Sequence, residues 1–189
     1  GEGFFLAALR KPEEDREADT DLFSPKKKKS KGDTAASPVS KENLAIAKSW
    51  LASSDEYNLL VNGTAITAFP VYYQNDLALL RQSLRIVQAG TEVAEVKGKD
   101  LIPAHGLAMS RLLKTSVFPT EALTYEQAIA YLRKEAIVLP PSVPKGYVLV
   151  TYKEIPLGFV KNIGNRANNL YPQEWRIRSG YLPDDIRTL

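Results

Sequence analysis

The feature that most constrains this chain is a long polar stretch, Lys11 to Val39, between an apolar beginning and a remainder of ordinary globular composition. The stretch is acidic first and then basic, with a run of lysines from Lys26 to Lys29 and with serine and proline throughout. Such a composition buries too little apolar surface to offset the entropy of ordering. We therefore expect residues 11–40 to be a disordered linker. Its lysines could contact nucleic-acid phosphates or could simply keep the linker solvated.

The ten residues before the linker, GEGFFLAALR, are typical of an apolar strand with glycines ahead of it. A single strand is not stable alone, and no neighbouring segment could pair with this one. We therefore expect residues 1–10 to be the last strand of a sheet whose other strands lie upstream, outside this chain. A frayed tail is the alternative.

A first small α+β unit is expected at residues 41–116. Ser40 suits the N-cap of a helix that carries Leu44, Ala47, Trp50 and Leu51 on one side. The elements expected after this helix are a short strand at 69–73, a helix capped by Asn75, a hairpin of 84–87 with 93–97, and a helix with Pro103 in its first turn.

A second unit is expected at residues 117–180, followed by a tail at 181–189. Thr124 and Gln127 have the spacing of a capping box, and apolar residues at helical spacing predict a helix that runs on to Ala136. Strands are predicted at 147–152, 155–163 and 175–178. Gly158 falls inside the second of them, where glycine usually marks a bulge or a close backbone approach. One helix with several short strands predicts a small β-barrel.

No catalytic constellation is visible. The chain has no cysteine, so it has no disulfide framework and no thiolate metal site. It also lacks a glycine-rich phosphate loop, a nucleophile elbow and metal-ligand spacing. The one histidine, His105, lies in the apolar segment IPAHGLA, where we expect a structural role. No apolar run approaches the roughly 20 residues that a membrane span needs. We therefore predict no catalytic residue and no metal site, and these features fit a cytoplasmic protein.

The strongest binding signal lies between Lys145 and Arg178. This stretch has six basic and two acidic residues, a formal charge of +4 against +3 for the whole chain. Cations hold phosphates, amides read base or sugar edges, and aromatic rings stack on unpaired bases. A solvated basic face with turn-forming asparagines is the alternative. The candidate RNA-binding residues are Lys161, Arg166, Asn168, Asn169, Tyr171, Arg176 and Arg178.

Three segments resemble, in the same order, segments of the RsmF-type ribosomal RNA cytosine-5 methyltransferases of the Sun family. GEGFFLAALRK is similar to the closing strand of the methyltransferase domain, and LRIVQAGTEVAEVKGKDLIPAHGLAMS resembles the segment after it. PLGFVKNIGNRANNLYP resembles the P-L-G-x-x-K … K-N-x-Y-P signature of the PUA-like domain, although Asn168 and Leu170 depart from that pattern. The matching positions are Pro156, Leu157, Gly158, Lys161, Asn169, Tyr171 and Pro172.

The resemblance implies an α+β chain in which the second unit is a PUA-like β-barrel. It also implies that the S-adenosylmethionine site and the two cysteines of the parent enzyme lie upstream, so that this chain holds no cofactor and does not methylate. Its expected partners are ribosomal RNA and the methyltransferase domain in cis, with no membrane, and its expected role is to position the RNA for that domain. Three alternatives stay open: a structural buttress with little RNA affinity, a complete enzyme, and transfer RNA as substrate.

Overall fold

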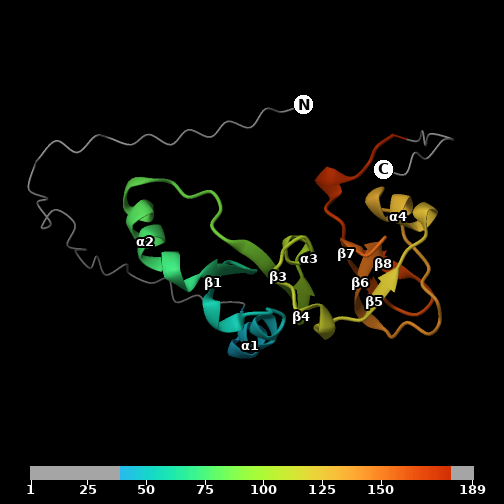
Figure 1. Ribbon diagram of the computed structural model, residues 1–189, viewed down its shortest axis with the longest axis horizontal. Coiled ribbons are helices and arrows are strands. Elements are labelled where there is room, and N and C mark those ends of the chain that lie inside the picture. Colours follow the sequence, from blue (N-terminus) through green and yellow to red (C-terminus); the bar gives the residue numbers. More distant parts are fainter. Residues whose placement is uncertain (1–38, 180–189) are drawn as a thin grey trace, which may run out of the picture. The chain divides into compact units, whose positions relative to one another are not determined.

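The computed structural model describes residues 39–179, which contain two four-stranded sheets and several short helices (Figure 1). Short helices are interspersed with the strands of two largely antiparallel sheets, which agrees with the predicted α+β class. The strand predicted at 1–10, the linker up to residue 38 and the tail at 181–189 lie outside the described residues.

The first sheet has the order β1-β2-β3-β4, and all its strands are antiparallel. Ser40 caps the helix before it, as predicted, because its hydroxyl accepts a hydrogen bond from the Asn43 backbone N–H at 3.1 Å. The elements of this part are α1 Lys41–Ser49, η2 Ser54–Glu56, β1 Tyr57–Asn62, β2 Ala65–Pro70, η3 Val71–Tyr73, α2 Gln74–Ser83, β3 Thr91–Lys97, β4 Asp100–Pro103, α3 His105–Ala108 and η4 Thr115–Val117.

The hairpin predicted between 84–87 and 93–97 is wrong. Gly90 has a φ of +82°, and an ideal Cβ there would lie 2.2 Å from the Ala68 carbonyl oxygen. The backbone at Gly90 therefore lies directly against β2. The strand that follows it, β3, pairs with β2 and not with residues 84–87. On its other side β3 pairs with β4, through a turn at Gly98.

Three further predictions in this part need correction. The strand predicted at 69–73 is only the end of the longer β2, since the chain turns into η3 after Pro70. Asn75 lies inside α2 and does not cap it, because η3 runs directly into the helix. Pro103 ends β4, so that α3 begins only at His105.

The second sheet has the order β5-β6-β7-β8. Strand β5 is parallel to β6, and α4 makes the crossover between them; the other pairs are antiparallel. No pairing of β8 with β5 closes the sheet in the described part of the chain, so the barrel stays a prediction. The elements are β5 Thr120–Ala122, α4 Tyr125–Leu132, β6 Gly146–Tyr152, β7 Ile155–Asn162, β8 Ala167–Asn169 and η5 Gln173–Trp175. The strand predicted at 175–178 is wrong, because η5 stands at its start.

Helix α4 begins at the predicted capping box. The Gln127 backbone N–H donates to the Thr124 hydroxyl at 3.3 Å, and the Thr124 N–H donates to the Gln127 side chain at 3.0 Å. The helix ends at Leu132, a turn earlier than predicted, because Lys134 adopts a left-handed φ of +68°. That turn brings the Lys134 ammonium to the Tyr171 carbonyl, to which it donates a hydrogen bond.

Gly158 marks a β-bulge, as its position predicts. It pairs with Val150 whereas Pro156 pairs with Thr151, so Leu157 is the extra residue. The bulge turns the strand. As a result Leu157 packs against a buried cluster that includes Tyr131 and Val160, whereas Phe159 belongs to a second cluster that includes Trp50 and Phe118.

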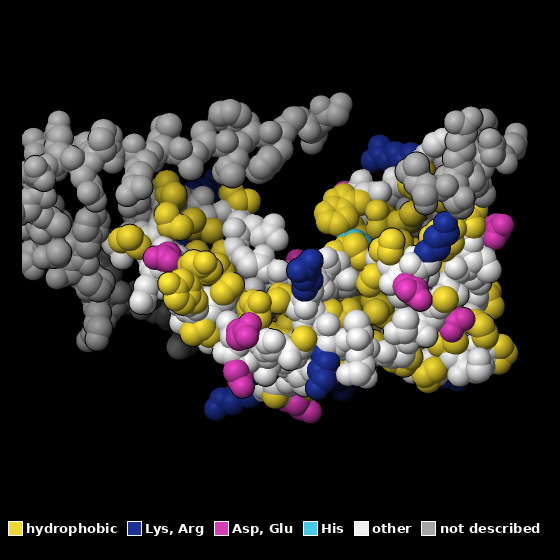
Figure 2. Space-filling view, in the orientation of Figure 1, with side chains coloured by type: hydrophobic (Ala, Val, Ile, Leu, Met, Phe, Trp, Pro, Cys, Tyr) yellow, Lys and Arg dark blue, Asp and Glu magenta, His cyan; other side chains and the backbone are white. Residues whose placement is uncertain are grey.

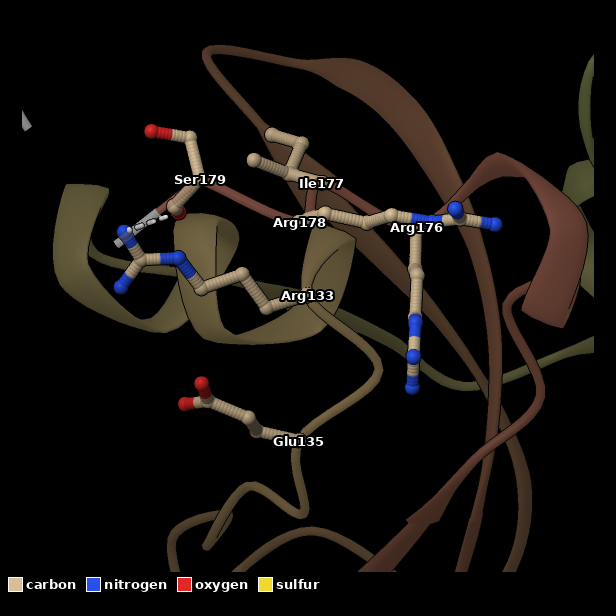
Figure 3. A pocket seen from close by; sticks show the side chains of 6 residues that line it. All are labelled: Arg133, Glu135, Arg176, Ile177, Arg178 and Ser179. Atoms are coloured by element: carbon tan, nitrogen blue, oxygen red, sulfur yellow. Dashed lines mark hydrogen bonds between the residues drawn. The ribbon is translucent and has the colours of Figure 1, made fainter. Parts of the chain in front are cut away.

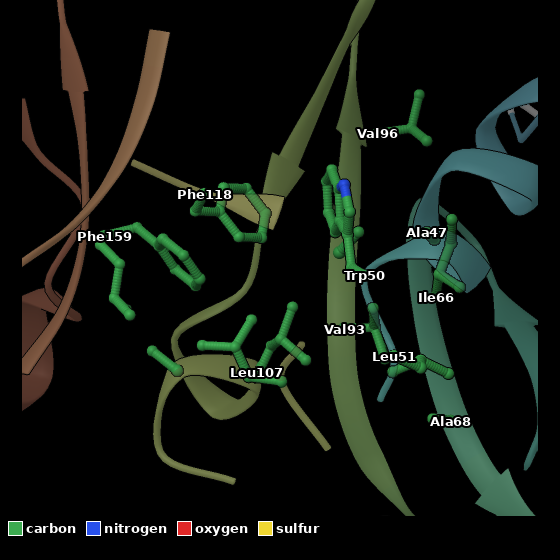
Figure 4. Close-up of a cluster of buried hydrophobic side chains, with 14 of the residues drawn as sticks. Ala47, Trp50, Leu51, Ile66, Ala68, Val93, Val96, Leu107, Phe118 and Phe159 are labelled. Carbon is green, nitrogen blue, oxygen red and sulfur yellow. The ribbon is translucent and has the colours of Figure 1, made fainter. Parts of the chain in front are cut away.

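One core cluster joins the two sheets. The Trp50 ring, which follows α1, lies 5.2 Å from the Phe118 ring, and Phe118 lies 4.8 Å from Phe159 on β7, measured between ring centroids. Figure 4 shows these rings beside Leu107 of α3 and the strands of the first sheet. Trp50 is 6% exposed and Phe159 1%. Because the core is continuous, the boundary between the two predicted domains stays a prediction.

Candidate nucleic-acid interface

The signature of the PUA-like segment meets the histidine segment of the first unit along one junction, which we call the seam: His105, Tyr131, Gly158 and Tyr171. An ideal Cβ at Gly158 would lie 2.1 Å from the Tyr131 hydroxyl oxygen and 2.9 Å from Nδ1 of His105. The His105 ring stands edge-on to Tyr171, with 5.2 Å between the ring centroids. Two sequence motifs about fifty residues apart therefore build one packed junction.

Lys161 also joins the two sheets. Its Nζ lies 2.6 Å from a carboxylate oxygen of Asp100, at the start of β4, and 5.5 Å from the centroid of the Tyr147 ring. The hydrogen bond that the Lys161 ammonium donates to the Asp100 carboxylate raises the pKa of Lys161 above its usual value. A phosphate would have to compete with Asp100 for this ammonium. The geometry therefore disfavours Lys161 as an RNA contact.

Asn169 holds the end of α4 to β8. Its Nδ2 donates to the carbonyls of Tyr131 and Glu135, at 2.8 and 2.9 Å, and its Oδ1 accepts from the Tyr171 N–H at 2.8 Å. The Asn169 amide is therefore occupied within the fold, and half-buried Tyr171 is part of the seam. Asn168 is half-buried on β8, opposite Lys161 in the register. The side chains of the signature therefore mainly make contacts within the protein, and few of their polar groups remain available to a ligand.

The other three candidates, Arg166, Arg176 and Arg178, are exposed cations. Arg176 and Arg178 line a cavity of about 330 Å³, which we call the arginine cavity (Figure 3). Its other lining residues are Arg133, Glu135, Ile177 and Ser179. Arg166 is not among the lining residues; it lies between β7 and β8.

The arginine cavity is suited to phosphate. Arg133 donates to the Ser179 carbonyl at 3.0 Å, whereas its buried Nε has no hydrogen-bond partner among the described residues. The Ile177 N–H donates to the Leu132 carbonyl at 2.9 Å and so fixes the arginine-bearing segment beside α4. Three guanidinium groups against the carboxylate of Glu135 give a formal charge of +2. Guanidinium groups bind phosphate through paired hydrogen bonds. Arg133 was not predicted, because it lies outside the basic stretch of the sequence.

A second cavity, of about 690 Å³, borders the seam, and we call it the seam groove. Its walls come from β3, from β4, from α3, from the turn after α4 and from the segment after β8, and they include His105, Lys134 and Trp175. The rings of His105 and Trp175 meet edge to face, 5.4 Å apart. Figure 2 shows the chain's single histidine at the surface among hydrophobic side chains. The groove therefore combines an aromatic wall with charged side chains.

Burial, reinforced by the Lys134 ammonium, lowers the pKa of His105 below its ordinary value of 6.5. Below that pH the His105 side chain binds a proton in the unfolded chain, whereas in the folded protein it stays neutral until a lower pH is reached. Stability from neutral His105 is therefore present above about pH 6.5 and is lost as the pH falls through the lowered pKa. We expect the free energy of unfolding, measured by urea denaturation across this range, to fall more steeply for the wild type than for His105→Asn. Parallel pH profiles for the two proteins would contradict this.

In the part of the chain that the structure describes, no group of three or more His, Asp or Glu side chains is arranged to hold a metal ion. None of the helices at residues 39–179 is long and apolar enough to cross a membrane.

Residues 118–177 match the family model described as the methyltransferase RsmF PUA domain. This segment contains all four strands of the second sheet, the signature half of the seam and most of the arginine cavity. The PUA-like character that the signature indicated is confirmed.

Curated relatives extend the match over nearly the whole chain. It is 28% identical over 188 residues to the ribosomal RNA small subunit methyltransferase F of Enterobacter sp. (strain 638), covering 96% of this chain and 36% of the relative. The protein of that name from Aliivibrio fischeri (strain MJ11) is 30% identical over 189 residues, covering 96% and 37%. The chain thus spans about a third of the length of these relatives. Its resemblance to the C-terminal region of RsmF-type methyltransferases, with a PUA-like domain, is confirmed.

Proposed function

We propose that this chain is an RNA-binding module that holds ribosomal RNA of the small subunit for a methyltransferase domain in the same protein. The arginine cavity carries the proposal, because it gathers Arg133, Arg176 and Arg178 around one cavity. The relatives support the choice of RNA, since they are named as methyltransferases of small-subunit ribosomal RNA. On this proposal the module orients the RNA so that one cytosine reaches the catalytic domain.

Catalysis belongs, in this proposal, to the upstream domain. That domain would bind S-adenosylmethionine and supply the two cysteines of the resemblance, and the whole protein would act in the cytoplasm as an RNA cytosine-5 methyltransferase. The described residues contribute affinity and orientation.

A structural buttress is the second candidate function, and the seam favours it. Lys161, Asn169 and Tyr171 make their described contacts within the protein, so the signature alone gives no reason to expect RNA affinity. The two candidates differ in one measurable respect. An RNA module binds structured RNA with a salt-sensitive affinity, whereas a buttress does not.

We expect Arg176→Ala with Arg178→Ala to lower the RNA affinity of the chain about 100-fold or more. Each lost charge-assisted hydrogen bond to phosphate costs about 1.5 kcal/mol or more, and about 1.4 kcal/mol is tenfold in affinity. The measurement is fluorescence anisotropy of a labelled hairpin from small-subunit ribosomal RNA.

The matched control is Lys145→Ala with Lys153→Ala, which removes the same charge from exposed positions outside the arginine cavity. We expect it to change the affinity about threefold or less, as for general electrostatic attraction. Equal losses in the two double variants would contradict a specific site. No binding by the wild type would favour the buttress.

A further inference from the structure

Trp175 has a large aromatic side chain that is exposed to solvent. Its side chain is 62% exposed although it lies in the short helix η5, whose backbone is fixed by a hydrogen bond from the Trp175 N–H to the Pro172 carbonyl. The only described ring beside it is that of His105, which meets it edge to face. An exposed tryptophan of fixed position is a platform on which an unpaired base can stack.

The same segment of chain borders two cavities of different charge. Glu174 and Trp175 line the seam groove, whereas Arg176 and the residues up to Ser179 line the arginine cavity. Neighbouring residues thus lead from an aromatic wall to a cavity that is lined by three arginines. In a single strand of RNA, each base is likewise followed by a phosphate.

The seam groove does not suit a phosphate. Three carboxylates and two ammonium groups line it, a formal charge of −1 against +2 in the arginine cavity. The Lys134 ammonium already donates to the Tyr171 carbonyl. By contrast, no hydrogen bond or ion pair joins the Glu92 carboxylate to another described residue. A carboxylate without a partner accepts hydrogen bonds from amino groups, such as N4 of cytosine.

We propose that the seam groove binds one unpaired nucleobase bearing an exocyclic amino group, stacked on Trp175, while the adjoining phosphate lies in the arginine cavity. This inference rests on the proposed function and adds the chemical class that the module selects. Cytosine, adenine and guanine offer amino hydrogens to the carboxylates. Uracil is disfavoured, because it has no exocyclic amino group and its two carbonyl oxygens flank the one N–H on that edge.

The test uses the full chain and short single-stranded RNAs of only cytidine or only uridine, with affinity measured by anisotropy and stacking by tryptophan fluorescence. Trp50 is buried, so quenching on binding reports on Trp175. Stacking of one base contributes about 1 to 3 kcal/mol, so we expect Trp175→Ala to weaken oligocytidine binding about 5- to 150-fold. Trp175→Phe, which keeps a ring, retains most of the affinity and serves as the matched variant. Glu92→Gln is expected to reduce the ratio of the affinity for oligocytidine to the affinity for oligouridine, because it removes the carboxylate that accepts from the amino group.

The outcomes separate this inference from the proposed function. If the arginine double variant loses RNA affinity while Trp175→Ala binds as the wild type does, without quenching in the wild type, the nucleobase site is wrong and the RNA module stands. Equal affinity of the wild type for the two oligonucleotides overturns the selection of amino-bearing bases. Absence of any RNA binding by the wild type overturns both proposals. Thermal unfolding of the variants shows whether a loss of affinity comes from a loss of fold.

Discussion

Replacing Gly158 by alanine is expected to lower the free energy of unfolding by about 3 to 5 kcal/mol, combining backbone strain with overpacking. The glycine has a φ of +143°, a conformation that residues with a Cβ rarely adopt. The added methyl would lie 2.1 Å from the Tyr131 hydroxyl oxygen. Tyr131 cannot easily withdraw, because it is fully buried and its hydroxyl donates to the Phe159 carbonyl at 3.2 Å.

Gly146→Ala is the matched control for this substitution. Gly146 lies on the neighbouring strand β6 and also has a positive φ, +119°, but nothing lies within 4 Å of an ideal Cβ there. The control therefore carries the strain without the clash, and we expect a loss of about 1 to 2 kcal/mol. Urea denaturation measures both. Equal losses would contradict the close approach of Tyr131 to Gly158.

Phe159→Ala is the second substitution with a large expected effect. The Phe159 ring is 1% exposed and is the last in the series Trp50, Phe118, Phe159 that joins the two sheets. Truncating a buried phenylalanine costs about 3 to 5 kcal/mol through lost burial and the cavity left behind. Denaturation followed by Trp50 fluorescence, in a Trp175→Phe background, measures the loss on the first-sheet side of the core.

Phe159→Leu is the control for that experiment. It retains most of the apolar volume, and we expect it to cost about 1.5 kcal/mol or less. If Phe159→Ala left the unfolding reported by Trp50 unchanged, the continuous core between the two sheets would be refuted.

Features set by local sequence could be predicted. The helix starts at Ser40 and Thr124 depend on side chains within three residues of the cap, and the β6–β7 pair joins segments that adjoin in sequence. Gly158 was marked by its position inside a strand. Strand β8 was missed because three residues carry no periodicity. The hairpin at 84–87 failed because the contact of Gly90 with Ala68 joins residues more than twenty positions apart.

The candidate site residues also fall into two groups: those whose contacts depend on distant parts of the chain, and those that the basic stretch of the sequence indicated correctly as exposed cations. Lys161 was chosen for its charge, but its partner Asp100 lies 61 positions away, and no local pattern reveals such a pair. The amide of Asn169 was also occupied by distant backbone carbonyls. Arg176 and Arg178, by contrast, are exposed at one cavity, where the fold adds Arg133 from the end of α4. A basic stretch predicts that a surface is cationic, but only the fold decides which cations remain available.

The claim that RNA is held at the arginine cavity and not by the signature lysine is tested most directly by the salt dependence of RNA binding. The logarithm of the binding constant falls with the logarithm of salt concentration by about 0.7 for each phosphate neutralised on a single strand. We predict that the slope for Arg176→Ala with Arg178→Ala is smaller than that of the wild type by about 0.7, for the one phosphate that the arginine cavity no longer binds. Lys161→Ala should keep the wild-type slope, because that ammonium is paired with Asp100. An unchanged slope in the arginine variant, or a comparable decrease in Lys161→Ala, would contradict the account.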